Sequence, residues 1–91
     1  MIHQSILVSN RLGLHARAAA KLVRLASRFS SDIYISREDA NQQIDSKSIL
    51  GILMLAASKG TQLVISIEGE DEIEAGEAIC QLFETKFGEE N

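Results

Sequence analysis

The chain of 91 residues lacks several features that would assign it to other classes of protein. Its single cysteine, Cys80, excludes an internal disulfide bond and fits a reducing compartment. The longest apolar run, residues 49–57, is about half as long as a helix that spans a bilayer. The N-terminal residues show neither the basic nor the apolar region of a secretory signal peptide. We therefore expect a cytoplasmic protein without membrane insertion, formed by one domain over residues 1–91.

Aromatic residues are scarce, at 4% of the chain, and the formal net charge is −4. Nucleic-acid binding is therefore disfavoured, because it needs basic surface and aromatic platforms for the bases. The charge is unevenly distributed, however. Residues 11–28 contain five basic residues and no acidic one, whereas residues 68–91 contain nine acidic residues and one basic residue. A basic segment of this kind can steer the protein toward acidic partners.

One short segment carries the main candidate for chemistry, Gly13-Leu14-His15-Ala16-Arg17. The alanines that follow favour a helix beginning directly after His15, and Gly13 suits a turn that needs positive φ. The first N–H groups of a helix are unpaired, and its dipole favours negative charge there. A phosphate on His15 would meet these N–H groups, with Arg17 close by. The alternative is that His15 only caps the helix.

Hydrophobic periodicity predicts the order strand, helix, strand, strand, helix, strand, helix. The strands are expected at 2–8, 33–37, 42–45 and 61–68, and the first helix at 16–29. The second helix is expected to begin near Ser46, as its cap, and to end at residues 58–60. The third should begin within residues 70–72, and residues 87–91 should fray. Helices in so small a domain must share one face of one sheet, which makes an α+β two-layer sandwich.

Two helix surfaces are candidates for partner binding. The first helix carries a basic stripe, and without interleaved acidic residues this stripe favours docking over a merely solvated face. Its members are Arg17, Lys21, Arg24 and Arg28. The second helix is apolar nearly all round, so part of it should stay exposed as a docking patch. The alternatives are a solvated face for the first helix and complete burial for the second.

The motifs resemble those of HPr, the phosphocarrier family of the bacterial phosphoenolpyruvate-dependent phosphotransferase system. Residues 13–17 resemble its phosphohistidine signature, and residues 47–53 its regulatory-serine region. Residues 56–61 and 68–72 also fit. The resemblance implies an open-faced sandwich in which three helices cover one face of a four-stranded antiparallel sheet.

The resemblance also implies a function. HPr proteins accept a phosphoryl group on the histidine, here His15, from phosphorylated enzyme I and pass it to an EIIA-type protein. The family pattern places the group on Nδ1. We expect Arg17 to stabilise the phosphate and the chain to act as a monomeric carrier rather than an enzyme. No metal cluster, nucleotide loop or second catalytic carboxylate is visible, so we expect no cofactor and no metal.

Regulation and docking complete the implied picture. Ser48 matches the serine that a dedicated HPr kinase/phosphorylase modifies in some bacteria, in the first turn of the second helix. The resemblance places Ile52, Leu55 and Ala56 in the core. The expected partner-binding residues are Arg17, Ala18, Lys21, Arg24, Ile49, Leu50 and Leu53.

Two departures and several alternatives stay open. The chain has no proline, and Ala18 stands where many HPr proteins have one. Leu12 replaces a small or polar residue of several relatives, which leaves the role of the loop in doubt. The chain could serve the sugar branch or the nitrogen branch (the NPr type). It could also act as a regulatory interaction module, as a paralogue that lost carrier function, or as an enzyme with His15 as general base.

Overall fold

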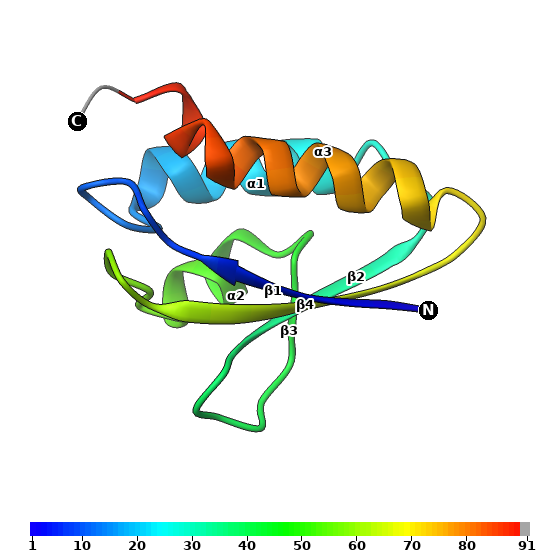
Figure 1. Ribbon diagram of the computed structural model, residues 1–91, viewed down its shortest axis with the longest axis horizontal. Helices are drawn as coiled ribbons and strands as arrows, with labels where there is room; N and C mark the ends of the chain where they lie inside the picture. Colours follow the sequence, from blue (N-terminus) through cyan, green and yellow to red (C-terminus); the bar gives the residue numbers. More distant parts are fainter. Residues whose placement is uncertain (90–91) are drawn as a thin grey trace.

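The computed structural model describes residues 1–89, and its elements follow the predicted order (Figure 1). They are β1 (Ile2–Leu7), α1 (Ala16–Ala26), β2 (Asp32–Arg37), β3 (Ile44–Asp45), α2 (Ile49–Met54), β4 (Gln62–Glu68) and α3 (Glu72–Glu84). A short 3-10 helix, η1 (Lys86–Gly88), follows α3. Within residues 1–89, no helix is both long enough and apolar enough to cross a membrane.

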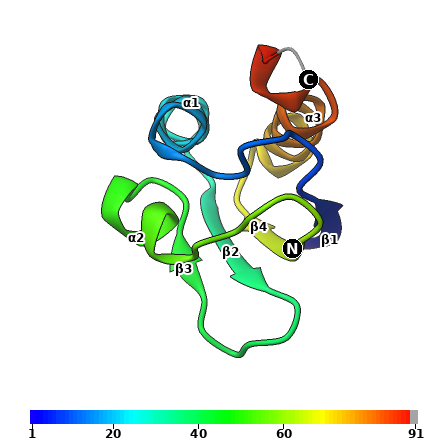
Figure 2. The ribbon, with the colours of Figure 1, turned by 90° about the vertical axis from the view of Figure 1, so that its left-hand side faces the viewer.

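The sheet has the strand order β1-β4-β2-β3, and every pair of neighbours is antiparallel. β4 lies between β1 and β2, with Ile65 opposite Gln4 on one side and opposite Ile35 on the other. Alternate residues of β4, Leu63, Ile65 and Ile67, are buried as predicted, because side chains along a strand alternate between its faces. The helices cover one face of this sheet (Figure 2). The predicted open-faced α+β sandwich is therefore confirmed.

α1 packs closely because its inner face carries small residues. Ala19, Leu22 and Ala26 are buried as predicted, while Val23 and Phe29 pack at the edge of the core. The helix ends at Ala26 rather than at the predicted Phe29. The last residues of the predicted helix instead form tighter turns, in which the N–H group of Phe29 donates to the carbonyl of Ala26.

α2 is shorter than predicted at both ends. Its N-cap is Ser48, whose hydroxyl accepts the N–H of Gly51 at 3.2 Å, so the prediction of Ser46 as cap was wrong. Ser46 is buried, and its own N–H donates to the carbonyl of Ile33 in β2. The helix stops at Met54 because Ala56 takes a left-handed conformation, with φ 51°. Gly60, predicted to end the helix, lies in the turn before β4.

Residues 87–91 were predicted to fray, but the C-terminal segment up to residue 89 packs against the rest of the protein. The ring of Phe87 is buried and meets Phe83 edge to face, with the ring centroids 4.9 Å apart. Lys21 donates from Nζ to the carbonyl of Phe87 at 2.5 Å. Burial of a whole aromatic ring offsets the cost of the left-handed backbone at Lys86 and Phe87. Residues 90 and 91 of the predicted tail lie outside the described residues.

Asp71 joins the start of α3 to the connection between α1 and β2. Its carboxylate accepts the N–H groups of Ser30 and Ser31, at 2.9 and 3.0 Å, and the hydroxyl of Ser31. These bonds, first among them the Ser31 hydroxyl, lower the pKa of Asp71 from 3.8 to about 2. The ionised form is thus the one that the fold stabilises.

We predict that Asp71→Asn destabilises the fold at neutral pH. The pKa of Asp71 is lowered in the folded protein, so its contribution is complete above the unfolded pKa of 3.8 and is lost as the pH falls through about 2. The difference between the urea midpoints of variant and wild type should therefore shrink toward pH 2. Glu74→Gln, an exposed carboxylate in the same helix, is the matched control. An equal difference at both pH values would contradict the account.

Candidate functional site

The loop between β1 and α1 is fixed by backbone hydrogen bonds on both sides of His15. Gly13 has φ 67° and donates its N–H to the carbonyl of Asn10 at 3.1 Å. Leu14 is buried and donates its N–H to the carbonyl of Ala57, beyond the end of α2, at 2.8 Å. His15 then accepts the first helical hydrogen bond, from Ala19. The histidine backbone is thereby held between α1 and the segment after α2.

The imidazole of His15 caps α1. Its Nδ1 atom accepts the N–H of Arg17 at 3.3 Å, and its side chain remains 26% exposed. A ring nitrogen that accepts an N–H must carry a lone pair, so the proton of the neutral ring belongs on Nε2. The capping alternative is thus correct in geometry, but it leaves a nucleophilic nitrogen facing the unpaired N–H groups of a helix N-terminus.

The other ring nitrogen meets a residue from the far end of the chain. Nε2 of His15 contacts a carboxylate oxygen of Glu89, whose second oxygen accepts from Nδ2 of Asn10 at 3.0 Å. Burial raises the pKa of Glu89, but the bonds from Asn10 and His15 and the charges of His15 and Lys21 more than offset it. The pKa of Glu89 therefore lies below its usual value, and the carboxylate is ionised at neutral pH.

Asn10 and Glu89 were missed by sequence reasoning. Asn10 is fully buried and also donates from Nδ2 to the carbonyl of Gly13, so it braces the same loop. Glu89 lies 74 residues from His15 and follows a segment that was expected to fray. The single available signal was Phe87, a large apolar residue in an otherwise acidic and polar tail.

The predicted basic stripe is divided in two by the structure. Arg17 and Arg24 are exposed on α1, and Arg28 is exposed in the turn that follows the helix. Lys21 is half-buried and bonds to the C-terminal segment. Ala18, predicted as a partner-binding residue, is fully buried, so its side chain packs in the core beneath the helix and is not exposed to a partner.

α2 leaves a contiguous apolar surface, which we call the α2 patch: Ile49, Leu50, Leu53 and Met54. Their exposed fractions are 40, 71, 38 and 76%, so the alternative that the whole helix is buried was wrong. Met54 was not predicted to belong to this surface. α1 lies beside α2 at the end of the molecule that faces the viewer in Figure 2.

The inner face of α2 agrees with prediction in part. Ile52 and Leu55 are buried, but Ala56 is exposed, because the chain leaves the helix before reaching it. Ser48 is exposed and lies at the N-cap rather than in the first turn, adjacent to the α2 patch. Leu12, whose role was in doubt, is 60% exposed on the loop before His15.

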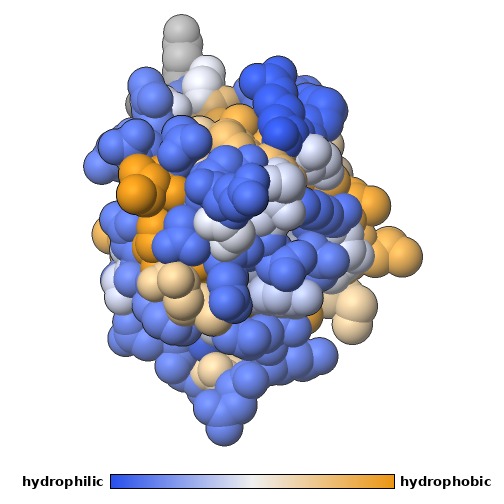
Figure 3. Space-filling view, turned by 90° about the vertical axis from the view of Figure 1, so that its right-hand side faces the viewer, coloured by the Kyte–Doolittle hydropathy of each residue, from blue (hydrophilic) through white to orange (hydrophobic). Residues whose placement is uncertain are grey.

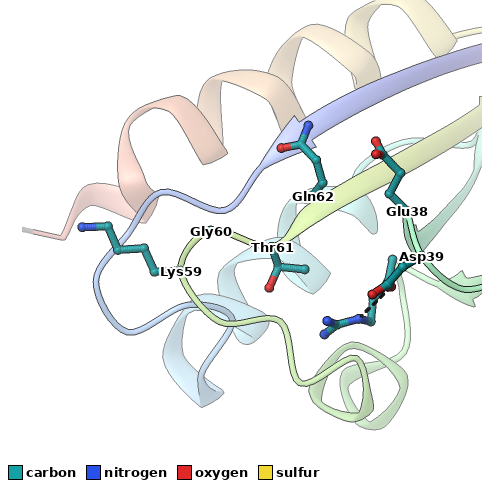
Figure 4. Close-up of a pocket in the computed structure, with 7 residues that line it drawn as sticks. Glu38, Asp39, Lys59, Gly60, Thr61 and Gln62 are labelled. Atoms are coloured by element: carbon teal, nitrogen blue, oxygen red, sulfur yellow. Dashed lines mark hydrogen bonds and ion pairs between the residues drawn. The ribbon is translucent and has the colours of Figure 1, made fainter.

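Other surface features are less suited to chemistry. The hollow in Figure 4 is lined by the end of β2 and the residues after it, and by the start of β4 and the residues before it; neither His15 nor Ser48 lines it. Arg37 in this hollow is engaged by Asp39 and by the carbonyl of Leu55. The end of the molecule that forms the right-hand side of Figure 1 is largely hydrophilic, with a few apolar patches (Figure 3). Among residues 1–89, no group of three or more metal-ligating side chains could hold a metal ion.

We predict that Gly13→Ala destabilises the protein by more than the strain of a left-handed residue, which is about 1–2 kcal/mol. A Cβ there would lie 2.5 Å from the carbonyl oxygen of Ala57 and 2.8 Å from Cα of Ser58, both backbone atoms that no rotamer change can move. Gly60→Ala is the control, since Gly60 also has positive φ but meets no atom within 4 Å. Equal urea midpoints for the two variants would contradict the predicted clash.

Comparison with known proteins gives a consistent picture. The family described as "PTS HPr component phosphorylation site" matches residues 2–85. The phosphocarrier protein HPr of Xylella fastidiosa is 44% identical over 90 residues, which cover 99% of each chain. The crystal structure of HPr-C-His from Thermoanaerobacter tengcongensis superimposes with a TM-score of 0.94 at 45% identity, covering both chains completely. HPr from Bacillus anthracis superimposes with a TM-score of 0.84 at 38% identity, covering 90% of this chain and 95% of its own. The chain therefore belongs to the HPr family of bacterial phosphocarrier proteins of the phosphotransferase system.

Proposed function

We propose that the protein carries a phosphoryl group on Nδ1 of His15, accepting it from phosphorylated enzyme I and passing it to an EIIA-type protein. The observation that carries this proposal is the position of the ring at the N-terminus of α1, with Nδ1 on the N–H of Arg17. Nε2 is occupied by Glu89, which leaves Nδ1 as the nitrogen for transfer. The proposed function is the one that the name of its relatives, phosphocarrier protein, describes.

The transfer needs little rearrangement. As the donor's bond to phosphorus breaks, the Nδ1 lone pair forms a new bond to phosphorus. The N–H of Arg17, released from Nδ1, can then donate to a phosphoryl oxygen, as can the next N–H group of α1. The exposed guanidinium of Arg17 adds a charge that stabilises the transferred group. The reverse step delivers the group to the acceptor, and the protein contributes position and charge rather than bond chemistry of its own.

Partner proteins dock, in this proposal, on the surface that surrounds His15. The exposed arginines of α1 attract acidic partners, and the α2 patch supplies apolar area that becomes buried on contact. In this proposal the protein acts as a monomer in the cytoplasm and needs no cofactor to accept and pass on the phosphoryl group. The proposal concerns the relay that the sugar and nitrogen branches share. The α2 patch also supports a second candidate function, a regulatory module that acts by docking alone.

We further propose that Ser48 is a regulatory site, the target of an HPr kinase/phosphorylase. Its hydroxyl is exposed at the N-cap of α2, beside Ile49 and Leu50. A phosphate there would place a doubly charged group at the edge of the α2 patch, where a partner's apolar surface would have to desolvate it. Phosphorylation would therefore weaken docking without altering His15 itself.

The relay predicts one acid-labile phosphate on His15. Intact mass should rise by one phosphate after incubation with enzyme I, phosphoenolpyruvate and magnesium, and this gain should be lost after brief acid treatment. His15→Ala should gain none, whereas His3→Ala should gain one, because His3 lies on β1 and bonds to Ser66 instead. Partner binding that survives in His15→Ala, with no phosphate gained by the wild type, would favour the docking module.

The Ser48 proposal predicts different outcomes for two substitutions. Ser48→Ala removes the cap of α2 and should cost about 1 kcal/mol of stability, with transfer rates near those of the wild type. Ser48→Asp retains a capping oxygen but adds a charge beside the α2 patch, so it should stay stable and transfer several-fold more slowly. Urea unfolding and initial rates of phosphate gain measure both effects. Transfer by Ser48→Asp at the wild-type rate would argue against regulation at this position.

A further inference from the structure

We propose that Glu89 is a positioning residue for His15, which holds the proton on Nε2 and stabilises the charge that the ring acquires when Nδ1 takes the phosphoryl group. The inference rests on the relay proposed above. Its basis is the contact between Nε2 of His15 and the Glu89 carboxylate, together with the bond from the Arg17 N–H to Nδ1. It assigns a role in the transfer to the C-terminal segment of the chain.

The two contacts of the ring require one tautomer. The N–H of Arg17 can donate to Nδ1 only if that nitrogen carries its lone pair. An ionised carboxylate can only accept, so Nε2 must donate its proton to Glu89. A neutral histidine in water exchanges between both tautomers, whereas here each neighbour selects the same one. The nucleophilic lone pair is thereby kept on the nitrogen that faces the helix N-terminus.

Glu89 is itself held by a specially shaped segment. Lys86, Phe87 and Gly88 all have positive φ, at 56, 58 and 73°, and turn the chain after α3 back toward the β1–α1 loop (Figure 1). Three consecutive left-handed residues persist only where surrounding contacts determine them. The buried Phe87 ring and the bond from Lys21 to the Phe87 carbonyl provide such contacts.

The Glu89 carboxylate is also fixed at its second oxygen. Asn10 donates to that oxygen at 3.0 Å, and the Glu89 side chain is only 14% exposed. Asn10 at the same time donates to the carbonyl of Gly13, in the loop that carries His15. One buried amide thus couples the position of the carboxylate to the position of the histidine backbone.

The charge balance of the transfer explains what the carboxylate contributes. When neutral His15 attacks through Nδ1, phosphorus gains a bond to nitrogen and the donor's bond breaks, while the proton stays on Nε2. The ring then bears a positive charge beside Glu89. A carboxylate that orients a histidine and stabilises its imidazolium form is a known arrangement in catalysis. Glu89 contacts Nε2, so its negative charge lies across the ring from the phosphoryl group that approaches Nδ1. The positive charge of Lys21 partly balances the charge of Glu89.

Two substitutions separate the tautomer from the charge. Glu89→Ala removes the acceptor for Nε2–H together with the negative charge. The nitrogen shifts of His15 should then show a mixture of tautomers, and initial phosphate gain should slow on the order of 10-fold. Glu89→Gln removes the charge at nearly constant size, so transfer should slow even where its single amide oxygen still accepts from Nε2–H, because its NH₂ group cannot replace the oxygen that accepts from Asn10. Glu84→Gln makes the same change of charge at an exposed position of α3 and should alter neither. Urea midpoints show whether each variant remains folded.

The outcomes distinguish this inference from the proposed relay. An unchanged tautomer ratio in Glu89→Ala would overturn the positioning role. So would an unchanged or a faster phosphate gain, the latter meaning that Glu89 obstructs the site. If the wild type gained no phosphate, the relay would fail. The nitrogen shifts would still decide whether Glu89 controls the tautomer, because they are measured without a partner protein.

Discussion

The hydrogen bond from the Arg17 N–H to Nδ1 of His15 links the fold of this protein to its proposed chemistry. The same bond caps α1 and marks the nitrogen that can act as a nucleophile. It requires the histidine to stand at the junction of loop and helix, which Gly13 permits by its positive φ and Leu14 secures by bonding to Ala57. The rest of the structure can be understood as support for this junction, since displacement of the loop would lose the cap and the site together.

The two sides of the ring are supported by different parts of the chain. Nδ1 depends on α1, whose small inner residues let it lie close to the sheet. Nε2 depends on the segment after α3, which is anchored by the buried Phe87 and brings Glu89 to the ring. Segments near both ends of the sequence thus contact the His15 ring, while 26% of its side chain stays exposed.

Patterns of local sequence predicted much of this architecture. Alternation identified β4, and the helical spacing of Ala19, Leu22 and Ala26 identified the face of α1 that is buried. The limits of α2 could not be predicted, because Ser46 and Ser48 are equally good caps and only the pairing of β3 with β2 decides between them. The contact of Glu89 with His15 was beyond reach for a related reason. It depends on left-handed backbone at Lys86 and Phe87, residue types that rarely adopt it, and on a partner 74 residues away.

The central claim is that the phosphoryl group bonds to Nδ1 while Nε2 keeps its proton toward Glu89. The most direct test is nitrogen–phosphorus coupling in protein labelled with ¹⁵N-histidine and phosphorylated by enzyme I. The account predicts coupling of phosphorus to Nδ1 of His15, a protonated Nε2, and unchanged signals for His3, the second histidine of the chain. Coupling to Nε2 instead would contradict it, because Glu89 would then have to leave the ring before transfer.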